Sequence, residues 1–255
     1  MNKKELKEFL DFKAAHYEQP HFLAHDPIQI PHLFHKKEDI EISGFLVATI
    51  AWGNRQSIIK SGKRILELMG NDPFHFVMEH QEKDLSPFDS FIHRTFNGTD
   101  LRFFISALQS VYRNHGGLEN LFSKPLNSQR LDQNIHEFRN CFFQLEHKKR
   151  TEKHVADPLK GSAAKRINMF LRWMVRSEKR GVDFGLWKSI KPAQLSCPLD
   201  VHSGNVARNL GLLKRNQNDQ KAVLELDTAL RQLDALDPVK YDYALFGLGV
   251  FEKIK

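Results

Sequence analysis

Cysteine is nearly absent from the sequence, which contains only Cys141 and Cys197 among 255 residues. Two cysteines cannot build a framework of several disulfides, and they cannot supply the thiolates of an iron–sulfur cluster or a cysteine-rich zinc site. Histidine is more frequent, with thirteen residues, but pairs such as His32 and His35 lack the spacing of a known metal site. We therefore expect no metal and no other cofactor.

Several other patterns are also missing. The sequence has no GxxxxGK[ST], GxGxxG or GxSxG motif, so nothing in it favours nucleotide binding or a serine hydrolase. Its apolar runs are shorter than the ~18 residues of a membrane-spanning helix. Residues 1–20 carry acids among their lysines instead of the apolar core of a signal peptide. These absences predict a cytoplasmic protein that does not contact a membrane.

Strand-like alternation of apolar and polar residues is not found, nor is an internal repeat. Apolar residues recur at helical spacing, which predicts an all-α protein of about ten helices. Thr99 or Asp100 is expected to cap the helix that runs to Gly116. The expected helical ranges are 3–18, two helices within 41–69 joined near 52–55, 71–80, 99–116, 131–149, a short helix within 181–196, 199–213, 220–236 and 237–251.

Positive charge is concentrated in one part of the sequence. The formal net charge is +7, yet His147–Lys191 alone has thirteen Lys/Arg against four Asp/Glu, a surplus of +9 that leaves −2 for the rest. A concentrated basic segment indicates a polyanionic partner, most simply nucleic acid. The alternative is a solvated basic face.

Within this segment, "DPLKGSAAKRINMFLRW" (157–173) places Lys165 and Arg166 at the start of an apolar helix. Cations there oppose the positive end of the helix dipole, and such departures from local rules concentrate at functional sites. The small residues after Gly161 let another backbone approach, and exposed N–H groups bind phosphate. Because the dipole and Arg166 disfavour its ammonium form, Lys165 is a candidate nucleophile that forms a Schiff base. The alternative is a surface lysine that only contacts phosphate.

A second stretch, "CPLDVHSGNVARNLGL" (197–212), is typical of a helix that begins after Asp200. Asp200 makes a good N-cap, while Val206 and Leu210 face inward and Arg208 faces outward. Taken alone, the pattern indicates a structural cap.

The two stretches together resemble the helix-hairpin-helix (HhH-GPD) DNA glycosylase superfamily of base-excision repair. The family hairpin reads roughly LPGVGxKTAN. Aligned without gaps, Gly161 takes its first glycine, Ala163 its second, Lys165 its lysine nucleophile and Asn168 its asparagine.

The second family motif, VDTHxxRVxxRLGL, is similar to Leu199–His202 and Val206–Leu212 here. Asp200 thereby falls on the family's catalytic aspartate. Residues 45–66 resemble the buried helix, DNA-wedging turn and following helix of the family, and residues 237–250 resemble its last core helix.

The resemblance implies a two-lobed helical fold with a central cleft. Residues 40–176 would form a helical barrel lobe that includes the hairpin, and residues 1–39 with 177–255 would form the second lobe. The implied partner is damaged double-stranded DNA, bound by a monomer. No four-cysteine motif is present, and "WGNR" (52–55) is not the usual wedge sequence, so the lesion is not predicted.

The implied activity is a DNA glycosylase with AP lyase activity, in which Lys165 attacks C1′ and Asp200 stabilises the cationic sugar. Trp52, Trp173 and Phe246 are candidates for stacking on a base, with core packing as the alternative. A non-catalytic nucleic-acid-binding protein of the same fold is the competing interpretation. The residues expected to contact DNA are Lys160, Gly161, Ser162, Ala163, Ala164, Arg166, His202 and Arg208 in the two motifs, and Asn54 and Arg55 in the turn.

Overall fold

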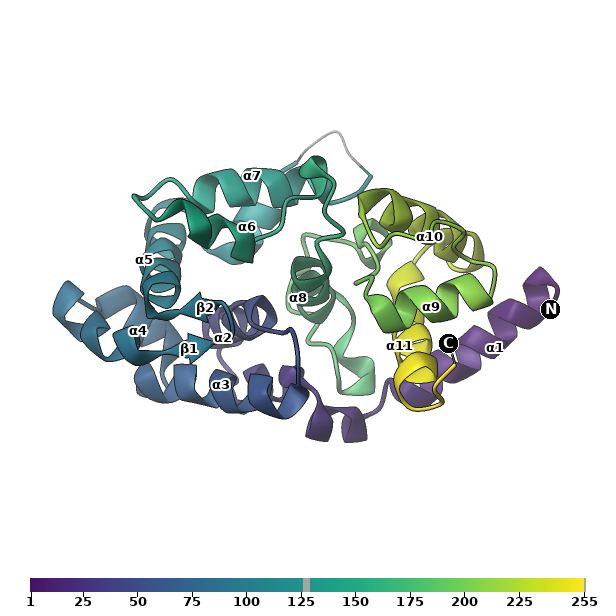
Figure 1. The fold of residues 1–255 in the computed structure, drawn as a ribbon, viewed down its shortest axis with the longest axis horizontal. Helices are drawn as coiled ribbons and strands as arrows, with labels where there is room; N and C mark the ends of the chain where they lie inside the picture. Colours follow the sequence, from purple (N-terminus) through teal and green to yellow (C-terminus); the bar gives the residue numbers. More distant parts are fainter. Residues whose placement is uncertain (126–128, 255) are drawn as a thin grey trace. The chain divides into compact units, whose positions relative to one another are not determined.

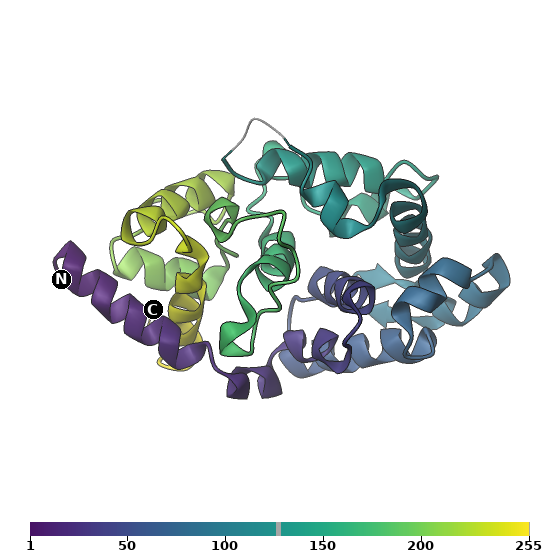
Figure 2. The same cartoon turned by 180° about the vertical axis from the view of Figure 1, so that it is seen from behind.

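The computed structural model describes residues 1–125 and 129–254 and is mostly helical, which confirms the all-α class (Figure 1; Figure 2). The strands that it contains are two residues long: β1 (Ile92–His93) pairs with β2 (Phe96–Asn97) in an antiparallel hairpin that the sequence pattern had not predicted. Two-residue strands are too short to show alternation. No helix in the described part of the chain has the length and apolar character needed to cross a membrane.

The chain divides into two compact units. Unit 1 comprises Met1–Phe22, Asn127–Gln133 and Asp157–Lys255, and unit 2 comprises Leu23–Leu126 and Asn134–Ala156. Residues 157–176 therefore belong with the C-terminal part of the chain, and residues 23–39 belong to unit 2, so the expected boundaries at 39 and 176 differ from the observed ones at 22 and 156. The physical reason is a set of bonds from the hairpin and its helix to later residues of unit 1, described below.

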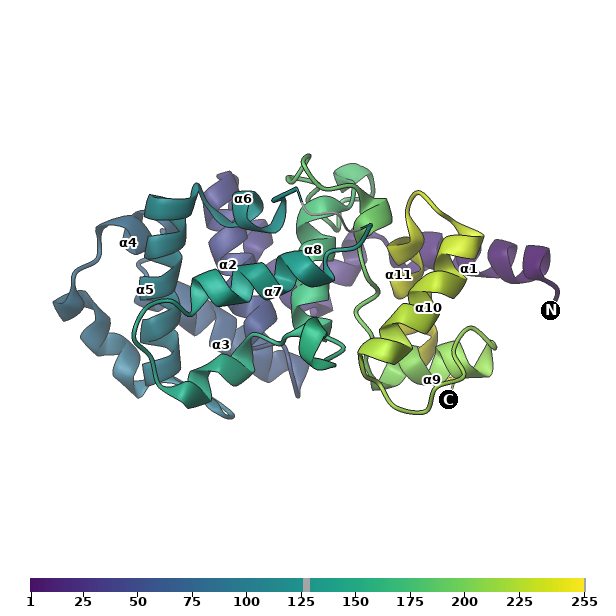
Figure 3. The same cartoon turned by 90° about the horizontal axis from the view of Figure 1, so that it is seen from above.

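Unit 1 is built around its last helix, α11, which is mostly apolar and packs against α1 and α9 (Figure 1; Figure 3). The contact with α1 is close: a Cβ at Gly247 would lie 2.1 Å from the ring of Tyr17, so only glycine fits there. The α-helices of this unit are α1 (Lys3–Tyr17), α8 (Lys165–Val175), α9 (Val201–Asn209), α10 (Gln220–Leu233) and α11 (Tyr241–Val250).

Unit 2 packs around α2, whose residues from Asp39 to Thr49 are all buried. Phe45 of this helix contacts the rings of Phe104, Phe138 and Phe142, which come from two other helices. The α-helices of this unit are α2 (Lys37–Thr49), α3 (Arg55–Leu68), α4 (Pro73–Glu79), α5 (Gly98–His115), α6 (Leu118–Phe122) and α7 (Asp132–Phe142), of which the first residues of α7 belong to unit 1.

Most expected helices are present, with three corrections. The N-cap of α5 is Asn97, which forms a capping box with Asp100, so neither Thr99 nor Asp100 is the cap itself. Helix α7 ends at Phe142 rather than near 149, and a 3₁₀ turn at Lys149–His154 follows. Residues 181–196 contain the short 3₁₀ turn Pro192–Gln194 in place of the expected helix, and the turn ends at Leu195, whose backbone is extended.

Candidate active site

The hairpin between residues 157 and 165 lies in unit 1 and is held by its own backbone. A 3₁₀ turn, η6 (Pro158–Lys160), is capped by Asp157 and ends at Gly161, whose φ of 89° favours glycine. The carbonyl of Gly161 accepts a hydrogen bond from the N–H of Gln220 at 3.0 Å, and Ser162 forms an isolated bridge with Asp219. These bonds attach the hairpin to the start of α10.

Three N–H groups expected to bind phosphate already donate within the protein. Those of Gly161 and Ser162 donate to the carbonyls of Pro158 and Asp157, and that of Ala164 donates to the Ser162 hydroxyl at 3.2 Å. Their use as phosphate donors would require these bonds to break.

Helix α8 begins without a side-chain cap. Its N-cap residue is Ala164, which has a left-handed conformation (φ 46°) and a methyl group that cannot accept a hydrogen bond. The family's second hairpin glycine falls on Ala163, yet the positive φ occurs at Ala164, so the alanine at 163 is not strained by its backbone. The side chain of Asn168 donates to the carbonyl of Ala163 at 3.1 Å and fixes the loop. The first N–H groups of α8 consequently have no side chain to satisfy them.

Lys165 and Asp200 meet at the starts of two helices of unit 1. Lys165 is the first residue of α8, Asp200 is the N-cap of α9, and Lys165 Nζ lies 3.4 Å from Asp200 Oδ2. The side chains are partly accessible, with relative exposures of 33% and 19%. The structure thus brings together the two residues to which the sequence comparison assigned the chemistry.

Asp200 is held in place by a capping box. Its Oδ1 accepts hydrogen bonds from the N–H and hydroxyl of Ser203 at 2.9 and 3.2 Å, and the Asp200 N–H donates to that hydroxyl. The side chain of Asn218 donates to the Asp200 carbonyl at 2.9 Å. Because Oδ1 serves the cap, Oδ2 is left to face Lys165. Ser203 could have been found from its spacing to Asp200, whereas Asn218 has no signal in the sequence.

A buried carboxylate lies close to this pair. Asp242 of α11 forms an ion pair with Arg172 of α8 and accepts a weak hydrogen bond from the Cys197 thiol at 3.7 Å. Burial raises the pKa of Asp242, the guanidinium of Arg172 opposes this effect, and the charges of Asp200 and Lys165 also act on it. Asp242 therefore belongs to the electrostatic environment of Lys165, although no motif in the sequence singled it out.

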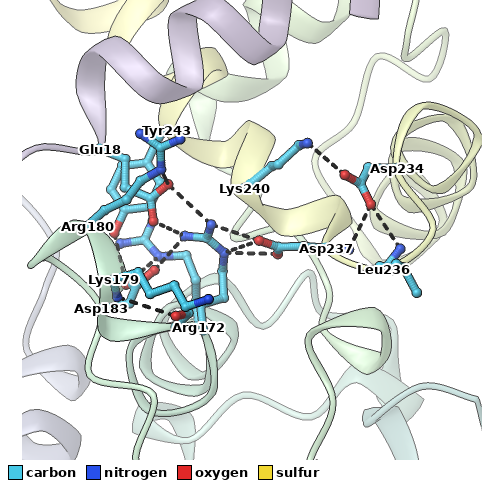
Figure 4. Close-up of polar contacts among 12 residues, drawn as sticks. Glu18, Arg172, Lys179, Arg180, Asp183, Asp234, Leu236, Asp237, Lys240 and Tyr243 are labelled. Carbon is cyan, nitrogen blue, oxygen red and sulfur yellow. Dashed lines mark hydrogen bonds and ion pairs between the residues drawn. The ribbon is translucent and has the colours of Figure 1, made fainter.

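A larger ionic network lies at the C-terminal end of α8, around Arg176, and Figure 4 labels its carboxylates. Arg176, the C-cap residue, pairs with Glu18 and Asp183 at 2.6 Å each and with Asp237 at 2.9 Å. Figure 4 shows these carboxylates converging from separate segments, with Tyr243 beside them. Burial raises the pKa of Glu18, and Arg176 opposes the rise. The network connects the N-terminal helix to the C-terminal half of unit 1.

The remaining basic residues of the two motifs differ in their surroundings. Lys160 is exposed at the hairpin, and Arg166 is half-buried, with burial lowering its pKa to about 10, so it stays cationic at neutral pH. His202 is exposed at the start of α9. Arg208, expected to face outward toward DNA, donates to the carbonyls of Arg215 and Asn216 at 2.8 and 2.9 Å. Its observed role is to hold that loop, so its expected DNA contact would compete with these bonds.

The three aromatic candidates also differ from one another. Trp173 has a relative exposure of 0% and lies in the core, so it offers no face to a base. Phe246 is half-buried and packs edge-to-face on Phe22. In unit 2, Trp52 is half-buried, stacked near His154 at 6.0 Å between ring centroids. The adjoining Asn54 caps α3, and Arg55 opens that helix.

The basic segment 147–191 is divided between the two units. Its first cations, at 148–153, belong to unit 2, and those from 160 onward belong to unit 1. Arg172 and Arg176 are buried and paired with carboxylates. A surplus counted along the sequence therefore overstates the positive charge that any one surface presents. Among the described residues, no three His, Cys, Asp or Glu side chains are placed so that they could hold a metal ion.

Comparison with known proteins identifies a family model described as "Protein of unknown function (DUF2400)", which matches residues 26–251. No curated protein and no solved structure matches the sequence. The matched range contains the hairpin, Lys165 and Asp200. Because it covers most of the sequence, the chain belongs to the DUF2400 family.

Proposed function

We propose that this protein is a DNA glycosylase with AP lyase activity, built on a helix-hairpin-helix glycosylase fold. The observation that carries the proposal is the pairing of Lys165 Nζ with Asp200 Oδ2 at 3.4 Å, at the starts of two helices. A cap alone needs an aspartate at 200 but no lysine opposite it. A phosphate-binding lysine needs no carboxylate beside it, since a carboxylate would repel the phosphate.

The local backbone supports the same fold. A short 3₁₀ turn, a glycine with positive φ and helix α8 follow one another as a helix, hairpin and helix. The asparagine that the family motif requires, Asn168, holds the loop through the Ala163 carbonyl. The uncapped first turn of α8 leaves its backbone N–H groups without a side-chain acceptor.

The proposed reaction begins when a damaged nucleotide is flipped out of the duplex, which costs a few kcal/mol and least for damaged or mismatched bases. Lys165 Nζ, after losing a proton, forms a bond to C1′ while the glycosidic bond breaks. The base leaves with the bonding electron pair and is protonated. The C1′–O4′ bond then opens to give the imine, and removal of a C2′ proton expels the 3′ phosphate.

Asp200 has two functions in this scheme. Its Oδ2 is close enough to Nζ to assist the transfer of the ammonium proton, and its negative charge stabilises the cationic sugar. The capping box keeps the carboxylate in position without using Oδ2. The buried Asp242 also acts electrostatically on this pair, while its own charge is balanced by Arg172.

Borohydride trapping tests the proposal. The protein is incubated with duplexes that carry an abasic site, 8-oxoguanine or an oxidised pyrimidine, and borohydride reduces any imine to a stable adduct seen on a gel. We expect an adduct that Lys165→Gln abolishes while DNA binding persists. Lys160→Gln is the matched control, because it removes the same charge from the same hairpin. At saturating duplex it should retain trapping.

Two results would overturn the proposal. A Lys165→Gln protein that still forms the adduct would remove this lysine from the chemistry. Absence of any adduct, together with tight and salt-sensitive DNA binding, would instead favour the competing interpretation, a binding protein without catalysis.

A further inference from the structure

A groove of about 510 Å³ lies in unit 2 between helix α3 and the segment around His25. The α3 side chains that line it include Arg55, Lys60 and Lys63, and the acidic residue among the lining side chains is Glu67. This groove is separate from the hairpin and from Asp200, which belong to unit 1.

The two lysines of the groove are available to a ligand. Lys60 and Lys63 are exposed, and neither has a carboxylate within ion-pair distance among residues 1–125 and 129–254. The carboxylate of Glu67 is already engaged by Arg64 at 3.1 Å. An excess of accessible positive charge therefore faces the groove, and it is not compensated from within the protein.

The spacing of these cations suits an extended anion better than a single phosphate. Arg55 and Lys63 lie eight residues apart on one helix, which corresponds to roughly 12 Å at a rise of about 1.5 Å per residue. One strand of duplex DNA carries a phosphate about every 3.4 Å along the helix axis, so this length spans about three or four phosphates. A linear polyanion can extend along this row and contact both exposed lysines.

Helix α3 is firmly seated, so the groove is preformed. A Cβ at Gly62 would lie 3.1 Å from Val47 and 3.3 Å from Ile30, which shows how closely the buried face of α3 approaches its neighbours. The cationic side chains are on the accessible face of the same helix. The groove starts at Arg55, next to the Trp52–Arg55 turn.

We propose that this groove binds the phosphodiester backbone of duplex DNA and forms a contact surface separate from the Lys165 site. The choice of DNA as the polyanion rests on the proposed function, whereas the anionic character of the ligand rests on the groove itself. Lys60 and Lys63 bind phosphates without reading sequence, so the contact raises affinity and salt dependence for any duplex.

The test is fluorescence anisotropy with an undamaged labelled duplex, titrated at several salt concentrations. The test variant is Lys60→Gln/Lys63→Gln, and the matched control is Lys3→Gln/Lys4→Gln, which removes the same charge from exposed positions on α1. If each lysine contacts one phosphate, the slope of log K against log salt becomes shallower by about 1.8, and affinity at 0.1 M salt falls by more than about tenfold. The control should retain wild-type affinity and slope.

The proposal is overturned if the test variant binds like the wild type, or if the control loses as much affinity as the test variant. An unchanged melting temperature shows that both variants are folded. Failure of the groove proposal can be distinguished from failure of the proposed glycosylase function. Groove variants should still be trapped by borohydride at saturating duplex. If the wild type gives no trapped adduct while the groove variant alone loses affinity, the glycosylase proposal falls and the groove stands.

Discussion

Replacing Asp200 by asparagine and by alanine separates the two roles of this residue, the cap of α9 and the charge opposite Lys165. Asparagine still accepts the hydrogen bond of the Ser203 N–H, because its amide oxygen can take the position of Oδ1. Alanine loses both the cap and the charge. The two variants therefore share any loss of charge and differ in the cap.

The expected magnitudes follow from the surroundings. The ion pair with Lys165 is partly accessible, so its loss lowers the free energy of unfolding by about 0–1 kcal/mol. Loss of the cap costs about 1 kcal/mol more, within a range of roughly 0.5–2. Urea denaturation should thus find Asp200→Ala about 1 kcal/mol less stable than Asp200→Asn. Both variants should slow adduct formation similarly, by about 10²–10³-fold, because both lose the charge that stabilises the cationic sugar.

The assay compares single-turnover trapping rates at saturating DNA with urea denaturation of the same preparations. If Asp200→Asn traps at the wild-type rate and only Asp200→Ala is destabilised, Asp200 acts as a cap and nothing more. If the rates followed stability across the two variants, the loss of activity would reflect folding and not charge. Ser203→Ala provides a control that weakens the capping box while leaving both charges in place.

Two further predictions concern the fold. Arg176→Met should lower the free energy of unfolding by about 3–5 kcal/mol in urea denaturation, because Glu18 and Asp183 would stay buried without their closest cation and would keep only longer contacts to Arg180 and Arg172. A loss below about 1 kcal/mol would contradict this reasoning. In unit 2, burial raises the pKa of Asp100, but hydrogen bonds from the Asn97 N–H and the Thr151 hydroxyl outweigh it and hold that pKa below its ordinary value. A carboxyl group whose pKa is lowered by folding stabilises the fold above about pH 4, and this contribution is lost as the pH falls through the unfolded pKa toward the folded one. The free energy of unfolding of Asp100→Asn should therefore fall less steeply than that of the wild type between about pH 5 and 3.

Local patterns in the sequence determined the helical class and several helix starts. The apolar spacing identified α1, α3 and α10, and Pro73 marked the first residue of α4. Asp200 was recognised as the N-cap of α9 because a cap depends on neighbouring backbone N–H groups alone. The end of α7 and the cap of α5 were placed wrongly. At α5, residues able to cap a helix stand two and three positions after the true cap, Asn97. At α7, apolar spacing continues past the last helical turn.

Only the tertiary structure decided what the charged and aromatic residues do. Lys165 and Asp200 are 35 positions apart, and packing alone sets the 3.4 Å between their side chains. The same packing buries Arg172 among carboxylates and Trp173 in the core. Periodicity reports which face of a helix is apolar but not which partner covers it. The residues that surround a side chain in space come from distant segments of the chain, which a local sequence pattern does not include.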